Sequence, residues 1–283
     1  MEIFQLMKRT RMKRIYVIKY FLLIVFLFQV QQSAFGQVAV FEKEHIPKDV
    51  PQSMDIYLVI GQSNMAGRAE IKKEDTAILE HAYLFTGNSS TPWVHARNPL
   101  NRYATTRKGI EMQRLSPAYS FTKVMIAHSS KEEIGLVMNA KGGTKIMQWL
   151  PGANLYEEAV KQTHKALEYG ILKGIIWHQG ESDSDPIRTE LYLERIEILI
   201  NALREEFNSP KLPFVAGQIF ESEKRNSFNK MILKLPSFID YTGVVSSKGV
   251  KTFDGTHFDS DSALMMGKRY AAEMKKIQDK LKK

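Results

Sequence analysis

The chain has 283 residues and no cysteine, which excludes a disulfide framework, a thiolate nucleophile and a thiolate metal site. Its 43% hydrophobic content is ordinary for a globular protein, and the length suits one sizeable α/β domain. The formal net charge is +9, but about half of it comes from the first 36 residues, where six basic residues face a single acidic one. The charge of the remaining chain is too small to indicate a nucleic-acid-binding surface.

The first 36 residues have the three-part layout of a secretory signal peptide. A basic segment precedes an apolar run over residues 20–30 (YFLLIVFLFQV), and a small-residue stretch, QQSAFG, follows it. The run is shorter than the roughly 18 residues that a membrane span needs, although extension back through residues 15–18 would give an uncleaved anchor. We expect a signal peptide over residues 1–36, cleavage after Gly36, a secreted or periplasmic protein, and a polar leader over residues 37–53.

Short apolar runs then alternate with helical patterns, which is typical of a parallel sheet covered by helices on both faces. Five runs are predicted strands, at residues 56–60, 134–138, 174–178, 214–219 and 241–245. Apolar residues at three- and four-residue spacing predict helices over residues 119–128, 155–169, 188–207 and 262–281. The segment 72–116 fits neither pattern, and we interpret it as a long excursion over the functional face of one domain spanning residues 54–283.

Four unusual polar clusters each follow a predicted strand. They are GQSNMAGR (61–68), NAKGGT (139–144), HQGESD (178–183) and DGTHF (254–258). An open parallel sheet binds its ligand beyond the carboxyl ends of its strands. We therefore expect the four clusters to meet at one edge of the sheet.

The first and last clusters contain the parts of a nucleophilic hydrolase. Ser63 can supply a hydroxyl in a turn between a strand and a helix start, although a serine in that place is often only a helix cap. Asp254 precedes His257 by three residues, so its carboxylate can hold the imidazole while the other ring nitrogen faces Ser63. An Asp-Gly turn beside a solvated histidine is the structural alternative.

The middle clusters offer donors for an oxyanion and several further candidates. Gly142 and Gly143 allow close approach of the backbone, or mark only a tight turn, and the Gln179 amide could donate or simply join neighbouring loops. Glu181 is a candidate for positioning His257 or Gln179, or else a buried acid paired with a base such as Arg68. Three residues are candidates for substrate contact: Asn64, Arg68 and Trp149. Trp93 and Tyr156 are further aromatic candidates. The alternative for each is core packing or a place on a solvated face.

Together GQSNMAGR, the GGT followed by Trp149, WHQGESD (177–183) and DGTHF resemble the successive blocks of the SGNH hydrolase superfamily. They are most similar to its sialate O-acetylesterase-like branch, which includes the acetylxylan esterases of carbohydrate esterase family 6. The resemblance covers about residues 56–270 and implies a flavodoxin-like α/β/α sandwich with a mostly parallel sheet, here expected to have five strands.

That resemblance also implies the roles of the site residues. Ser63 would be the nucleophile, Asp254 and His257 its partners, and the backbone of Ser63, Gly142 or Gly143, and the Gln179 amide would form the oxyanion hole. It implies a serine esterase that removes acetyl groups from acetylxylan, another acetylated polysaccharide or O-acetylated sialic acid, with no cofactor, no metal and no nucleic-acid partner. The alternatives are an esterase for lipid or aryl esters and a glycan-binding protein on an esterase fold.

Overall fold

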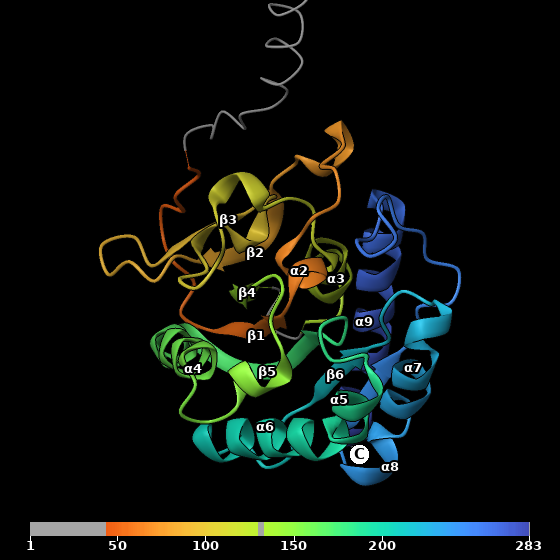
Figure 1. Ribbon diagram of the computed structural model, residues 1–283. Helices are drawn as coiled ribbons and strands as arrows, with labels where there is room; N and C mark the ends of the chain where they lie inside the picture. The colour runs from red at the N-terminus through yellow and green to blue at the C-terminus, as the bar shows by residue number, and fades with distance from the viewer. Residues whose placement is uncertain (1–43, 130–132, 283) are drawn as a thin grey trace, which may run out of the picture. The chain divides into compact units, whose positions relative to one another are not determined.

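The computed structural model describes residues 44–129 and 133–282 (Figure 1). The predicted signal peptide and the first part of the polar leader lie outside these residues. The described residues form one compact unit. In the part of the chain described, no helix is both long and apolar enough to cross a membrane.

A seven-stranded sheet in the order β3-β2-β4-β1-β5-β6-β7 forms the centre of the fold. Neighbouring strands are parallel except for the β2 and β3 pair at one edge. The strands are β1 (Met54–Gly61), β2 (Leu79–Phe85), β3 (Trp93–Ala96), β4 (Ile134–Ala140), β5 (Gly170–His178), β6 (Phe214–Gly217) and β7 (Thr242–Val245). The mostly parallel α/β architecture is confirmed.

The expected number of five strands is wrong, because β2 and β3 lie within the segment interpreted as an excursion. In β2, His81 has a positive φ of 63° and the pairing register with β3 shifts between Leu79 and Tyr83. This irregularity breaks the two-residue alternation by which a strand is recognised. β3 has only four residues, and Trp93 packs its ring against Phe85 at a centroid distance of 5.0 Å.

Helices cover both faces of the sheet, as the alternation of patterns predicts (Figure 1). They are α2 (Ser63–Ala66), α3 (Pro117–Ile126), α4 (Asn154–Ala166), α5 (Pro186–Glu190), α6 (Tyr192–Glu206), α7 (Asn226–Ile232), α8 (Leu235–Phe238) and α9 (Ser260–Leu281). The third predicted helix is two helices, α5 and α6, with Leu191 between them. Local caps begin several helices: Ser116 accepts from the Ala118 N–H, and Asp259 from the Ser262 N–H.

Alternate residues of β1 enter two separate cores. Ile56, Leu58 and Ile60 pack with α4 and α6 on one face, whereas Tyr57 and Val59 pack with α3 and α9 on the other. Every residue of β1 is therefore buried, as expected for a central strand of a parallel sheet. The site loops at its carboxyl end thus rest on a rigid element.

The carboxyl ends of β1, β4 and β5 are joined side by side. Gly61 pairs with Ala140 on one side and with His178 on the other. The Gln62 N–H donates to the His178 carbonyl at 2.8 Å, and the Lys141 N–H donates to the Gly61 carbonyl at 2.9 Å. Gly61 has φ +136°, and a Cβ there would lie 2.2 Å from the His178 carbonyl oxygen, so only glycine fits this crossing.

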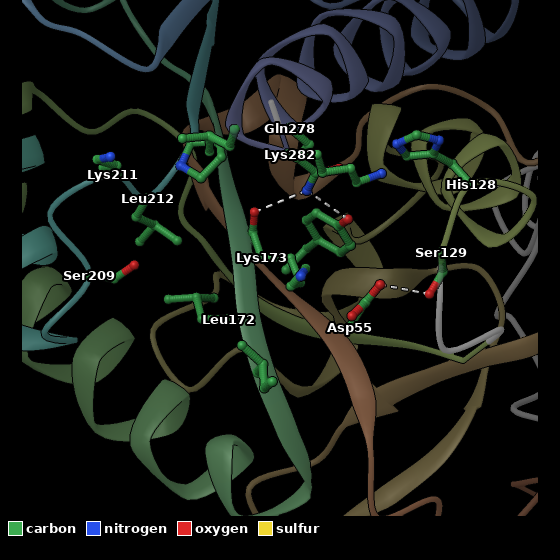
Figure 2. A pocket seen from close by; sticks show the side chains of 14 residues that line it. Asp55, His128, Ser129, Leu172, Lys173, Ser209, Lys211, Leu212, Gln278 and Lys282 are labelled. Carbon is green, nitrogen blue, oxygen red and sulfur yellow. Dashed lines mark hydrogen bonds between the residues drawn. The ribbon is translucent and has the colours of Figure 1, made fainter.

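A cavity of about 320 Å³ opens at the opposite edge of the sheet, around the first residues of β1 and β5 (Figure 2). Gln278 of α9 reaches into it and donates to the Tyr57 hydroxyl and to the Lys173 carbonyl. In open parallel sheets the ligand lies beyond the carboxyl ends of the strands, so this cavity is at the wrong edge for the fold's usual site.

Candidate active site

Ser63 is the first residue of α2, directly beyond the end of β1. It is 5% exposed, and its Oγ lies 3.0 Å from the Nε2 atom of His257. The N–H of a first helical residue has no acceptor within its own helix, so the Ser63 amide is available for another hydrogen bond. The serine therefore combines a hydroxyl beside a histidine with a free backbone donor.

His257 and Asp254 lie in the loop between β7 and α9. The Nδ1 atom of His257 is 2.6 Å from Oδ2 of Asp254, while Oδ1 accepts the N–H groups of Thr256 at 2.9 Å and His257 at 2.7 Å. Burial raises the pKa of Asp254, but the hydrogen bonds from His257 and Thr256 outweigh it, so this pKa lies below its usual value. An ionised Asp254 accepts a hydrogen bond from the Nδ1–H group and leaves Nε2 free to accept one from the Ser63 hydroxyl.

Two side chains outside this loop fix its position. Arg225 donates from Nη1 to the Gly255 carbonyl at 3.0 Å and from Nη2 to the Thr256 hydroxyl at 2.9 Å. Asn64 accepts the Phe258 N–H at 3.0 Å and donates to the Thr256 carbonyl at 3.2 Å. The amide oxygen and nitrogen of the buried Asn64 are both hydrogen-bonded within the protein, so this side chain joins the serine turn to the histidine loop, and a substrate contact through it stays a prediction.

The two neighbouring glycines, Gly142 and Gly143, have different surroundings. Gly142 is buried, and a Cβ there would lie 3.3 Å from the Ser63 Cβ. Gly143 is exposed, with φ +76°, and its Cβ would lie nearest to Lys108. Within residues 44–129 and 133–282 neither the Gly142 N–H nor the Gly143 N–H has a backbone hydrogen-bond partner, so their surroundings alone distinguish them. Gly142 is therefore the member of the pair that lies next to Ser63.

Gln179 does not offer its amide to the Ser63 site, contrary to the sequence-based prediction. Its Nε2 lies 2.6 Å from Oδ2 of Asp183, 2.9 Å from the Thr144 carbonyl and 3.1 Å from Oε1 of Gln62. Its Oε1 accepts the Tyr192 hydroxyl at 2.7 Å. Both amide hydrogens face acceptors inside the protein, so Gln179 joins loops and is not placed as an oxyanion donor.

Glu181 lies behind the site and contacts neither His257 nor Gln179 nor Arg68 in the described structure. Its Oε1 accepts from Asn64 at 2.6 Å and lies 3.6 Å from Nε2 of the fully buried His178. Burial raises the pKa of Glu181, but the interactions with His178 and Asn64 lower it below its usual value. Glu181 is thus a buried acid beside a base, with His178 in place of Arg68, and its contact with the histidine loop is through Asn64. A positioning role toward His257 stays a prediction.

Arg68 lies at the mouth of the site. It donates from Nη1 to the carbonyls of Gly67 at 2.7 Å and Met112 at 2.8 Å, and its Nη2 would be 2.7 Å from a Cβ at Gly142. Among the described residues no carboxylate lies within ion-pair distance of it. Burial and the nearby charge of Arg114 lower its pKa. A substrate contact through Arg68 stays a prediction.

Trp149 and Trp93 are 0% exposed, so they form no aromatic platform, and Tyr156 is 6% exposed, as core packing, the interpretation favoured for it, requires. The Trp149 ring packs edge-on against Trp177 at 5.3 Å, and its N–H donates to the Thr144 hydroxyl at 3.0 Å. A ring enclosed in this way has no face left for a sugar.

Sequence reasoning missed Arg225 and Phe253. The ring of Phe253 is stacked on His257, with centroids 5.8 Å apart and 24° between the planes, and the residue is 58% exposed. Its place directly before Asp254 was the one signal available. Within the described part of the chain no three histidine, aspartate or glutamate side chains cluster as a metal site.

Comparison with known proteins agrees with this geometry. Residues 53–276 match the family described as carbohydrate esterase, sialic acid-specific acetylesterase. A probable carbohydrate esterase of Arabidopsis thaliana is 30% identical in an alignment 248 residues long, which covers 80% of this chain and 92% of that protein. The crystal structure of an Arabidopsis thaliana protein has a TM-score of 0.71 at 26% identity and covers 80% of this chain and 98% of its own.

Two other solved structures share the fold. NanS has a TM-score of 0.65 at 14% identity and covers 82% of this chain and 99% of its own. A carbohydrate acetylesterase from Xanthomonas citri has a TM-score of 0.59 at 20% identity, covering 79% of this chain and 56% of its own longer chain.

Proposed function

Because the chain belongs to the carbohydrate esterase family of sialic acid-specific acetylesterases, we propose that it removes O-acetyl groups from carbohydrates through an acyl-enzyme intermediate. Membership of this family makes it a carboxylic ester hydrolase. The observation that carries the proposed mechanism is the hydrogen-bonded series from Ser63 through His257 to Asp254, with distances of 3.0 and 2.6 Å.

In the proposed first half-reaction, Oγ of Ser63 bonds to the ester carbonyl carbon while Nε2 of His257 accepts the hydroxyl proton. The resulting imidazolium is held by Asp254. The N–H groups of Ser63 and Gly142 stabilise the oxyanion. His257 then returns the proton to the departing sugar oxygen, and the acetyl group stays on Ser63.

In the second half-reaction a water molecule gives its proton to His257 and attacks the acetyl carbon. Collapse of the second tetrahedral species releases acetate and restores the Ser63 hydroxyl. The open side of this site includes Arg68, which we propose contacts the hydroxyl or carboxylate groups of the carbohydrate. The layout of residues 1–36 supports export, which fits a substrate outside the cytoplasm.

The test is acetate release from acetylated xylan, from O-acetylated sialic acid and from para-nitrophenyl acetate by the purified protein and Ser63→Ala. We expect the variant to lose about a thousandfold or more of kcat on every ester that the parent hydrolyses. Ser237→Ala, in an exposed serine of α8, is the matched control and should keep full activity. Activity that survives in Ser63→Ala would contradict the mechanism.

A further inference from the structure

Phe253 places an exposed aromatic ring beside the reacting groups. Single exposed apolar residues are common on protein surfaces, so exposure alone carries no inference. The position of Phe253 is different, because its ring is stacked on the imidazole of His257 and half of the residue or more is open to solvent. The other exposed phenylalanine in the described structure, Phe238, lies in α8 before the first residue of β7, at the opposite edge of the sheet.

The loop that carries Phe253 is held in one conformation from several directions. The Phe253 N–H donates to the His257 carbonyl at 3.1 Å, and Thr252 and Phe258 form an isolated antiparallel bridge. Arg225 holds the tip of the same loop through Gly255 and Thr256. A ring fixed in advance loses little conformational freedom when a ligand packs on it.

One face of the Phe253 ring lies over the imidazole in an offset stack, with the ring centroids 5.8 Å apart, so a ligand can pack on the opposite, open face. The sugar that carries the scissile ester must bring its carbonyl carbon to Oγ of Ser63, which lies 3.0 Å from Nε2 of His257 on the imidazole side. A second ring packed on the open face is separated from the imidazole by the thickness of Phe253. That ring therefore belongs to a neighbouring sugar unit.

We propose that Phe253 is a binding subsite for the pyranose residue next to the acetylated one, and that the enzyme consequently prefers acetylated oligo- or polysaccharides to acetylated monosaccharides. The apolar C–H face of a pyranose ring suits an aromatic face. This inference rests on the proposed function and adds to it a preference for longer carbohydrate substrates. The subsite binds substrate and takes no part in proton transfer.

The experiment compares partly acetylated xylo-, manno- and gluco-oligosaccharides with the acetylated methyl glycoside of each sugar, and uses para-nitrophenyl acetate as the ester without a sugar. For Phe253→Ala we expect kcat/KM on the oligosaccharides to fall about tenfold, mainly through KM, the size of a lost aromatic contact. The loss on the methyl glycosides and the aryl ester should be smaller, so the ratio of kcat/KM on an oligosaccharide to kcat/KM on its methyl glycoside should fall in Phe253→Ala. Phe253→Trp should keep the oligosaccharide activity, and Phe238→Ala, the matched control, should change nothing.

Three results would overturn the inference. Equal losses on all esters in Phe253→Ala, with a shifted pH profile, would make Phe253 a positioning residue for His257. If the parent enzyme has equal kcat/KM on oligosaccharides and methyl glycosides, the proposed subsite is contradicted, but the proposed acetylesterase activity is not. If the parent enzyme hydrolyses only the aryl ester, both the proposed carbohydrate substrate and the proposed subsite are contradicted.

Discussion

The variant Gly142→Ala adds a methyl group and tests whether Gly142 is the glycine that stabilises the oxyanion formed beside Ser63. Its φ lies outside the left-handed region, so alanine fits the backbone without strain. The added Cβ would lie 3.3 Å from the Ser63 Cβ, closer than most Cβ contacts, and 3.5 Å from its Cα, which is an ordinary contact. It would also lie 2.7 Å from the end of the Arg68 side chain. Arg68 can rotate away, but Ser63 sits at the end of a buried strand and can yield only slightly.

The size of the effect follows from this crowding. A displacement of about 1 Å between reacting groups costs roughly a hundredfold in rate. A shift of a few tenths of an ångström, together with the displaced guanidinium, should reduce kcat/KM of Gly142→Ala about tenfold, or about 1.4 kcal/mol of transition-state stabilisation. The free energy of unfolding should change by less than about 1 kcal/mol, because alanine also restricts the unfolded chain.

Gly143→Ala is the matched control, since its Cβ would meet only Lys108 at 3.5 Å but its φ is +76°. A left-handed alanine costs about 1–2 kcal/mol, so this variant should have a lower Tm and near-normal kcat/KM. The assays are steady-state hydrolysis of para-nitrophenyl acetate and thermal unfolding. Full activity in Gly142→Ala, or a larger loss of activity in Gly143→Ala at temperatures where it is folded, would refute the reasoning.

Two further variants examine the groups around His257. Asp254→Asn should lower kcat about a thousandfold or more, because an amide cannot hold the Nδ1 proton as a carboxylate does; unchanged hydrolysis of an aryl acetate would exclude the assigned role. Because the pKa of Asp254 is lowered in the folded protein, its stabilising effect is present above about pH 4 and disappears as pH falls through the folded value. The Tm difference between parent and Asp254→Asn should follow that course. Asn64→Ala leaves the buried Glu181 without its closest donor and should cost about 1–3 kcal/mol in denaturant unfolding, together with a fall in kcat; an unchanged midpoint would show that Asn64 does not hold the loop.

The edge of the sheet where the site forms could be predicted because its signals are local. Apolar runs mark β1, β4 and β5, and the polar clusters follow them directly in the sequence. The three-residue separation of Asp254 and His257 lets a single loop bring their side chains together. The meeting of Ser63 with His257 required only the parallel order of the strands, which the alternation of strands and helices already indicates.

The direction of the other side chains could not be predicted, because distant residues decide it. Gln179 and Trp149 both lie in loops beside the site, where sequence reasoning places them on the substrate side. Gln179 turns inward because Asp183, Thr144 and Tyr192 all offer it hydrogen bonds. Trp149 turns inward because it gains the burial free energy of a large ring while Thr144 satisfies its N–H.

Buried side chains such as Gln179 explain how the loops keep the site residues in fixed positions. Oε1 of Gln62 accepts from the Gln179 amide at 3.1 Å, and the same amide reaches Thr144, so three loops share one buried connection. Loss of a hydrogen-bond partner costs more free energy for a buried amide than for an exposed one. The hydrogen bonds of Gln179 therefore strongly favour this one arrangement of the loops. Much of GQSN and HQGESD is accordingly scaffold, and the motif positions that we propose act on the ester are Ser63, His257 and Asp254, with Gly142 beside them.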